Sequence, residues 1–351
     1  MMPEPTTQAG DMPVLHWLLQ KFPTTPKTRA KQWIVAGRVS VAGVVLRKPH
    51  QLIPDPGDTL QLLDRYDTSL NCGAGWQIHA RVTLLYLDSA VAIVNKGPGL
   101  ISVPAPDKEV LSALGILADF LAGKLKTKAL GRSGKSLPIA YRRLQPLPVH
   151  RLDQYTSGVF CIAMNPAARA KLIEQLRAHT MHRQYVAFAE GRAPAPKGTW
   201  RHWLQLTADE MRQQIVPEPK VQTDPPEAKE AITHYEVLAE YPVPGARGCV
   251  TKLQLRLETG RKHQIRVQAA NAGLPLIGDR AYNPRYRQIH PPSPVDFPRQ
   301  ALHAETLTLE HPDKPGTRLS WTAPFPNDLT QLEAMLKAGR AQPGQIGRAH
   351  V

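Results

Sequence analysis

Two short segments of the chain combine charged side chains with tight turns beside apolar runs. The first, His150–Gly158, places Asp153 in a polar turn directly before an apolar strand expected over residues 159–164. The second, Gly260–Arg266, places several hydrogen-bond donors at the turn that opens a helix after an alternating strand. Strand ends and helix starts are positions where a rigid scaffold holds reactive groups. Both segments are therefore candidates for chemistry.

The residue types in these segments indicate nucleophilic or acid–base chemistry. A carboxylate near a guanidinium stays ionised and can act as a nucleophile or as a base. A structural interpretation, in which Asp153 caps its turn and an arginine pairs with it, fits the residue types equally well.

Other kinds of site have weaker support. Residues Ala129–Ser136 satisfy a relaxed phosphate-loop pattern, but that loop works only between a buried strand and a helix N-terminus. Here basic residues precede it, and Leu137 and Pro138 stand where the helix should start. His179 and His182 lack a third metal ligand at a recognisable spacing, and the sequence contains no HExxH or GxSxG motif. We therefore expect neither nucleotide hydrolysis nor a metal site.

The composition points to a polyanionic partner. The 351 residues include 44 Lys plus Arg against 29 Asp plus Glu, a net charge of +15, and 42% are hydrophobic, enough for a sizeable core. No apolar run reaches the ~20 residues that a bilayer span needs, and the N-terminus shows no export signal, so we expect a cytoplasmic protein without membrane association. The three cysteines, Cys72, Cys161 and Cys249, are far apart, which indicates no disulfide framework.

Residues 12–63 are expected to form a first folded unit of two helices followed by short strands. Its second helix and the residues just after it carry four basic side chains with no acidic residue between them: Lys27, Arg29, Lys31 and Arg38. Two short helices and a curled hairpin with one basic helix resemble the S-four-type RNA-binding module, a small α/β unit, so these four residues are candidate RNA contacts. The alternative is a solvated charged face on a structural domain.

The remainder is expected to comprise a linker (64–81), a larger domain (82–328) and a C-terminal tail (329–351). Strands and helices alternate in the larger domain without regular βαβ repetition, which favours an α+β fold with a mixed, mainly antiparallel sheet. The long segments 105–148 and 283–300 are expected to be an insertion and a loop.

The segment HRLDQYTSG at 150–158 resembles the catalytic motif of the RluA-type family of RNA pseudouridine synthases. Segments resembling the other motifs of the family occur in order at residues 91–100, 183–191, 257–282 and 302–304. The resemblance spans residues 82–328 and implies the pseudouridine synthase fold. Three positions depart from the family pattern: Arg183 stands where Lys is usual, Asn95 where Asp is common, and Gln268 where His is frequent.

The resemblance also implies a role for each site residue. Asp153 would be the nucleophile, Arg266 would pair with it, Tyr185 would stack on the target uracil, and Arg151 would fill the space that the extruded uridine leaves. Enzymes of the family cut the glycosidic bond, turn the uracil and rejoin it through a ring carbon, with no metal or organic cofactor. Whether the aspartate attacks the sugar or removes a sugar proton stays open.

These observations predict a monomeric RNA-modifying enzyme that isomerises uridines, with large-subunit ribosomal RNA as the expected substrate and transfer RNA as the alternative. Two other classes remain. One is a non-catalytic RNA-binding assembly factor, and the other is a nucleotide-driven RNA helper that uses residues 129–136.

Overall fold

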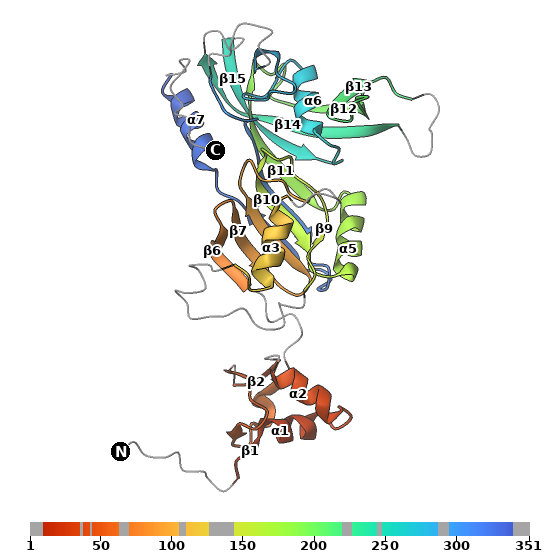
Figure 1. Ribbon diagram of the computed structural model, residues 1–351, viewed down its shortest axis with the longest axis vertical. Helices are drawn as coiled ribbons and strands as arrows, with labels where there is room; N and C mark the ends of the chain where they lie inside the picture. Colours follow the sequence, from red (N-terminus) through yellow and green to blue (C-terminus); the bar gives the residue numbers. More distant parts are fainter. Residues whose placement is uncertain are drawn as a thin grey trace.

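The computed structural model describes residues 10–35, 38–42, 44–62, 70–104, 110–125, 144–219, 227–243, 248–286 and 295–339. It contains a small N-terminal module and a large sheet flanked by helices (Figure 1). The phosphate-loop candidate at 129–136, most of the insertion at 105–148 and residues 287–294 of the expected loop lie outside the described residues.

The N-terminal module contains the two helices and the following short strands that its sequence predicts, and it has one further strand before the first helix. Its helices are α1 (Val14–Lys21) and α2 (Lys27–Val35), and its short strands are β1 (Met12–Pro13), β2 (Val39–Val41), β3 (Val44–Leu46), β4 (Leu52–Ile53) and β5 (Leu60–Leu62). β2 pairs with β3 and β5, and β1 pairs with β4. Val14, Leu18, Ala30 and Ile34 are fully buried in the core of the module. The apolar face of each helix therefore points inward and leaves the basic side chains of α2 outside.

The large sheet has 12 strands in the described residues, and its main path runs β13-β12-β14-β15-β11-β16-β10-β8-β7-β6, with β17 beside β16 and β9 beside β10. In chain order these are β6 (Leu70–His79), β7 (Val82–Leu87), β8 (Val91–Lys96), β9 (Leu147–Pro148), β10 (Ser157–Ala163), β11 (His182–Glu190), β12 (Lys197–Leu206), β13 (Gln213–Val216), β14 (Ala228–Val243), β15 (Gly248–Leu257), β16 (Leu302–Glu310) and β17 (Arg318–Thr322). The pair β10–β16 is parallel, and the other pairings described are antiparallel. The predicted α+β fold with a mainly antiparallel sheet is confirmed.

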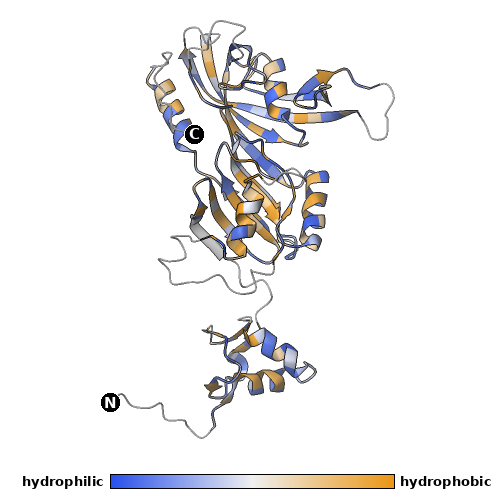
Figure 2. Cartoon of the chain, viewed as in Figure 1, coloured by the Kyte–Doolittle hydropathy of each residue, from blue (hydrophilic) through white to orange (hydrophobic). Residues whose placement is uncertain are grey.

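Two helices cover opposite faces of the sheet near β10. Val159 and Cys161 belong to the same cluster as Leu172 of α5 (Pro166–Arg177), whereas Phe160 packs with Phe120 of α3 (Ala113–Leu121). Because successive strand residues point to opposite faces, a strand covered on both sides must be apolar throughout. This accounts for the continuous apolar run, and Figure 2 shows α5 with both hydrophobic and hydrophilic residues, as expected for a helix on a sheet face.

The expected linker at 64–81 differs from the structure, because β6 occupies Leu70–His79 and pairs with β7. Its pairing is interrupted by register shifts, one of them between Asn71 and Trp76. A strand that contains Gly73 and Gly75 lacks clean apolar alternation, and its sequence is typical of a loop.

The expected tail at 329–351 is also wrong for its first part. Helix α7 (Asn327–Lys337) buries Leu329, Leu332 and Leu336 in a cluster with Phe188 of β11. The three leucines repeat at helical spacing and therefore lie on one face of α7. That face packs in the core of the larger domain.

Helix α6 (Gln264–Asn271) contacts β12 and β13 and begins at the turn that the sequence singled out. No helix in the described parts of the chain is both long and apolar enough to cross a membrane.

Candidate active site

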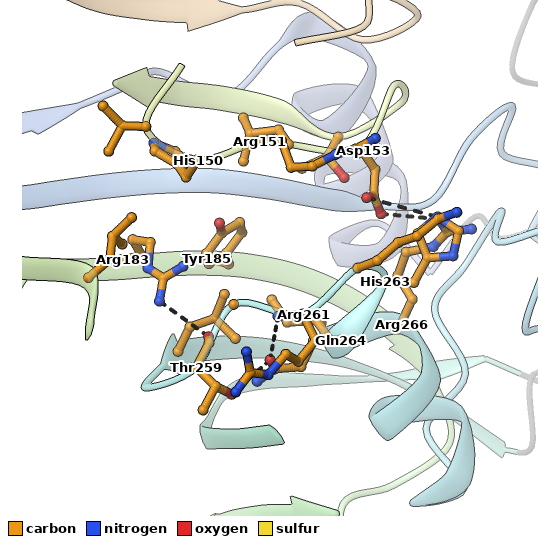
Figure 3. Close-up of a pocket in the computed structure, with 18 of the residues that line it drawn as sticks. His150, Arg151, Asp153, Arg183, Tyr185, Thr259, Arg261, His263, Gln264 and Arg266 are labelled. Carbon is orange, nitrogen blue, oxygen red and sulfur yellow. Dashed lines mark hydrogen bonds and ion pairs between the residues drawn. The ribbon is translucent and has the colours of Figure 1, made fainter. Parts of the chain in front are cut away.

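A cleft of about 550 Å³ opens where the turn before β10 meets the turn before α6 (Figure 3). Asp153, Arg151, Tyr185 and Arg266 all line it. They come from the turn, β11 and α6, which are far apart in the sequence, so the fold brings the four predicted site residues of the larger domain to one place. The basic residues of the N-terminal module, Lys27, Arg29, Lys31 and Arg38, do not line this cleft.

Arg266 holds two carboxylates. Its Nη1 donates to Asp153 Oδ2 (3.1 Å), while its Nε and Nη2 donate to the two oxygens of Asp279 (2.7 and 2.8 Å). The predicted contact of Arg266 with Asp153 thus consists of one hydrogen bond, and the two-bond contact is with Asp279. Burial alone would lower the pKa of Arg266, but the two carboxylates more than offset it, and the pKa is raised.

The two carboxylates differ in access to solvent. The side chain of Asp153 is 20% exposed, whereas that of Asp279 is 1% exposed. Asp279 also accepts backbone N–H bonds from Ala281 and Tyr282. Asp153 is therefore the carboxylate that a substrate can reach, and Asp279 is held inside the protein.

His263 stands beside Asp153 in an unusual backbone conformation. Its φ is 53°, in the left-handed region, and its Nε2 lies 3.9 Å from Asp153 Oδ1. The Tyr282 hydroxyl accepts the Gln213 N–H (2.7 Å) and lies 3.0 Å from His263 Nδ1. Burial lowers the pKa of His263 to about 4, so the ring is neutral near pH 7. A strained non-glycine residue at this position is typical of a functional site.

Buried donors hold the turn that carries Asp153. The Ser102 hydroxyl donates to the Leu152 carbonyl (2.8 Å) and accepts the Leu152 N–H (3.0 Å). The fully buried Lys96 ammonium donates to the carbonyls of Gly97, Leu100 and Gln154. Burial, together with the charge of Arg299, lowers the pKa of Lys96 to about 7. Three carbonyl acceptors match the three protons of an ammonium, so the geometry favours the charged form.

A second buried cation holds the other side of the turn. Arg299 donates from Nη1 to the Tyr155 carbonyl (3.0 Å) and pairs with Asp328 through Nε (2.7 Å). The Thr156 N–H closes the turn on the Asp153 carbonyl (3.1 Å). The backbone on both sides of Asp153 is therefore fixed by contacts with distant segments.

Tyr185 reaches the cleft from β11 at an irregular point of the sheet. The pairing of β11 with β16 shifts register between Gln184 and Tyr185, as at bulges that aim side chains into sites. Burial raises the pKa of Tyr185, so its hydroxyl stays protonated. Nearby, a Cβ on Gly158 would meet the Ala304 carbonyl oxygen at 2.0 Å, so the close approach of β10 and β16 requires glycine.

Arg183 and His150 also line the cleft. Arg183 donates to the carbonyls of Glu258 and Thr259, and burial lowers its pKa. Burial lowers the pKa of His150 to about 3, and its Nε2 accepts the Cys161 N–H (3.1 Å), so the ring is neutral. Among the described residues, no group of three or more His, Cys, Asp or Glu could hold a metal ion.

Sequence reasoning missed most of the residues that support Asp153, including His263, which also lines the cleft. The supporting residues are Lys96, Ser102, His263, Asp279, Tyr282 and Arg299. Four of them, Lys96, His263, Asp279 and Tyr282, lie in the motif segments at residues 91–100 and 257–282, but no pattern in those segments indicates what they contact. The site as a whole presents an accessible carboxylate, an aromatic ring and several cations, an arrangement suited to nucleophilic or basic chemistry on a polyanionic substrate.

Comparisons with known proteins agree with this chemistry. A family model described as RNA pseudouridylate synthase matches residues 90–271. The ribosomal large subunit pseudouridine synthase D of Yersinia pestis is 31% identical over 338 residues, which cover 92% of this chain and 90% of that protein. The protein of the same name from Pseudomonas aeruginosa is 31% identical over 336 residues, covering 92% of this chain and 91% of its own length.

A solved structure shares the fold. The structure of human RNA pseudouridylate synthase domain containing 4 aligns with a TM-score of 0.51 at 19% identity, over 72% of this chain and 92% of that one.

Proposed function

The chain belongs to the RNA pseudouridylate synthase family, and from this premise we propose that it converts specific uridines of large-subunit ribosomal RNA to pseudouridine in the cleft around Asp153. The observation that carries the proposal is the accessible Asp153 carboxylate held by Arg266 beside Tyr185. The proteins with which the chain aligns over 92% of its length carry this substrate in their names. A ribosomal RNA substrate would also place the enzyme in the cytoplasm, where we propose that it acts as a monomer.

Each cleft residue has a role in extruding and holding the base. A uridine inside folded RNA must leave its stack, which costs a few kcal/mol. Stacking on an aromatic ring contributes about 1 to 3 kcal/mol per base, and Tyr185 supplies that ring. Arg151 is exposed where it lines the cleft, so it can occupy the space that the uridine leaves.

Asp153 acts on the sugar of the extruded uridine, either by bonding to it or by removing one of its protons. Both routes require an ionised carboxylate, which Arg266 favours through its charge and hydrogen bond. The uracil is released from its nitrogen link, turns and rejoins through a ring carbon. The bond from the sugar to the ring nitrogen breaks, the bond to the ring carbon forms, that carbon loses a proton and the nitrogen gains one. The net reaction needs no oxidant, reductant or co-substrate, and we propose that it draws on no organic cofactor or metal.

The N-terminal module is the proposed second RNA contact. We assign it as an S-four-type RNA-binding domain that precedes the catalytic domain. The guanidinium groups of Arg29 and Arg38 lie over the ring of Trp33, at 5.9 and 5.3 Å from its centroid. Together with Lys27 and Lys31 of the same helix they would meet RNA phosphates.

Replacing the carboxylate tests the catalytic assignment. Asp153→Asn is expected to abolish pseudouridine formation and to leave RNA affinity nearly unchanged, because a single neutral amide hardly alters phosphate contacts. The matched control is Asp119→Asn, whose carboxylate is 46% exposed, pairs with Lys124 on the surface and does not line the cleft. Product formation by the Asp153→Asn protein at the wild-type rate contradicts the proposal.

Mapping pseudouridines in total RNA from cells with and without the gene tests the substrate. We expect the difference to fall in large-subunit ribosomal RNA. A difference confined to transfer RNA would retain the enzyme and replace the substrate, and no difference at all would contradict the proposed function.

A further inference from the structure

The turn that carries Asp153 also exposes an aromatic ring. Tyr155 is 45% exposed, and among the residues that the structure describes it is the one Phe, Trp or Tyr that is exposed rather than buried or half-buried. It follows Asp153 by two residues, so their Cα atoms lie within about 7 Å of each other. Leu152 and Thr156, on either side, are buried. The turn therefore anchors its ends and presents Tyr155 outward, next to the reactive carboxylate.

The backbone under Tyr155 is fixed. The carbonyls of residues 152–155 accept, in order, bonds from Ser102, the Thr156 N–H, Lys96 and Arg299. All four donor residues are buried. Because the backbone under Tyr155 is already ordered, binding a ligand to its ring costs little conformational entropy. That small cost offsets only a small part of the free energy gained from the contacts of the ring.

Contacts within the protein do not explain why the aromatic ring of Tyr155 lies on the surface. The hydroxyl of Tyr155 has no hydrogen-bond partner among the described residues, and its side chain does not line the cleft that takes the target uridine. Exposed aromatic rings are the surfaces on which splayed or single-stranded RNA bases stack. When a uridine of an RNA strand enters the cleft at Asp153, the neighbouring nucleotide of that RNA must lie close to the turn that carries Tyr155.

We propose that Tyr155 stacks on the base of a nucleotide that flanks the target uridine and thereby determines which RNA context the enzyme accepts. The inference rests on the proposed function, because it requires that RNA enters the cleft at Asp153. It adds a contact outside the cleft, made by a residue that takes no part in the isomerisation itself.

The first experiment measures steady-state kinetics on a synthetic RNA stem-loop containing the mapped uridine. Tyr155→Ser is expected to raise KM by about 5- to 150-fold, the range for losing one stacked base, and to leave kcat unchanged. The reason is that a flanking base stacks equally in the bound substrate and in the transition state. Tyr155→Phe keeps the ring and should retain the wild-type KM. The control is Leu238→Ser on β14, which is also 45% exposed and lies off the cleft.

The second experiment removes the base instead of the ring. Stem-loops with an abasic residue on one or the other side of the uridine are given to the wild type and to Tyr155→Ser. One of them should raise the KM of the wild type as much as Tyr155→Ser does, with no further rise when both changes are combined. Wild-type kinetics for Tyr155→Ser, or fully additive effects, overturns the inference. Inactivity of the wild type on the RNA overturns the proposed function instead.

Discussion

At the scale of single residues, Arg266 divides its guanidinium unequally between two carboxylates. The two-bond contact with Asp279 fixes the plane of the guanidinium, because parallel N–H bonds leave it little freedom to turn. Asp153 receives the remaining Nη1 alone. Asp153, the proposed reactive carboxylate, thus keeps acceptor positions free for a ligand, while the orientation of its arginine partner is set by the buried Asp279.

Asp279→Asn tests this dependence. The amide keeps the volume but loses the charge and half of the two-bond contact, so Arg266 and Asp153 should shift. We expect kcat to fall on the order of 10- to 100-fold, as for a small misplacement of a catalytic group, with RNA affinity unchanged. Steady-state kinetics and an RNA-binding titration measure the two quantities.

The control for this substitution is Asp296→Asn, an exposed aspartate in a neighbouring loop. Urea unfolding of both variants separates a site effect from a folding defect. An Asp279→Asn protein with the wild-type kcat would show that the buried carboxylate does not position Asp153.

The sequence predicted four residues that line the cleft, and it could not predict the residues that hold the turn around Asp153. Asp153, Arg266, Tyr185 and Arg151 sit in contiguous motifs and all reach the cleft. The bond from Lys96 to the Gln154 carbonyl joins residues 58 apart, and the bond from Arg299 to the Tyr155 carbonyl joins residues 144 apart. Because each acceptor is a backbone carbonyl, which every residue carries, no residue pattern reveals these pairings.

At the scale of elements, a buried hydrogen bond between Asp88 and His311 connects two turns of the sheet. Asp88, at the end of β7, accepts bonds from His311 Nε2 (2.6 Å), the Tyr86 hydroxyl (2.8 Å) and the N–H groups of Ala90 and Val91 (2.7 Å each). His311 directly follows β16. Burial alone would raise the pKa of Asp88, but these donors more than compensate, and the pKa is lowered.

The lowered pKa predicts how stability depends on pH. A carboxylate whose folded pKa lies below its unfolded value stabilises the fold above the unfolded value, near 4, and this contribution is lost as the pH falls through the folded pKa. Asp88→Asn is therefore expected to reduce the unfolding free energy by about 1.5 to 3 kcal/mol near pH 7, the range for hydrogen bonds to a charged group. The difference in unfolding free energy between Asp88→Asn and the wild type should become smaller below about pH 4.

Urea unfolding at a series of pH values between 7 and 3 measures this difference. The control is Asp313→Asn, which removes an ion pair with Lys171 (3.3 Å) and should cost about 0 to 1 kcal/mol as a surface pair. If the loss of unfolding free energy in Asp88→Asn is the same at every pH between 7 and 3, the ionised carboxylate does not have this stabilising role.

Elements with strong periodicity were predictable, and two others were not. β10 and the alternating end of β15 were expected within a few residues of their bounds, because burial on both faces or on one face leaves a clear pattern. β6 has glycines where apolar residues would mark a strand. The leucines of α7 do repeat at helical spacing, but docking onto β11 is a tertiary contact that the spacing alone does not show.

At the scale of the whole molecule, the net charge of +15 is distributed over surfaces with different tasks. Arg151 and Arg266 line the cleft around Asp153, where we propose that they act on one nucleotide. The basic residues of α2 and Arg38 lie in a separate module with its own hydrophobic core. Many other cations, such as Lys197 with Glu236, are already paired on the surface. The basic group in the N-terminal module, Lys27, Arg29, Lys31 and Arg38, is therefore the part of the charge that we propose for RNA phosphates.

Salt dependence distinguishes that group from the total charge. Each lost phosphate contact flattens the plot of log K against log salt by about 0.7 to 0.9. Changing Lys27, Arg29, Lys31 and Arg38 to Gln in the full chain should therefore reduce the slope by about 3 to 4 and weaken RNA binding, while kcat at saturating RNA stays at the wild-type value. Binding titrations at several salt concentrations measure the slope.

The control lowers the net charge by the same four units at cations that are already paired with acidic residues, namely Lys171, Arg192, Lys197 and Lys337. Since these side chains are engaged within the protein, their loss should leave the slope close to the wild-type value. Equal slopes for the two quadruple variants would mean that the N-terminal module contributes only its charge and makes no direct contact with the RNA.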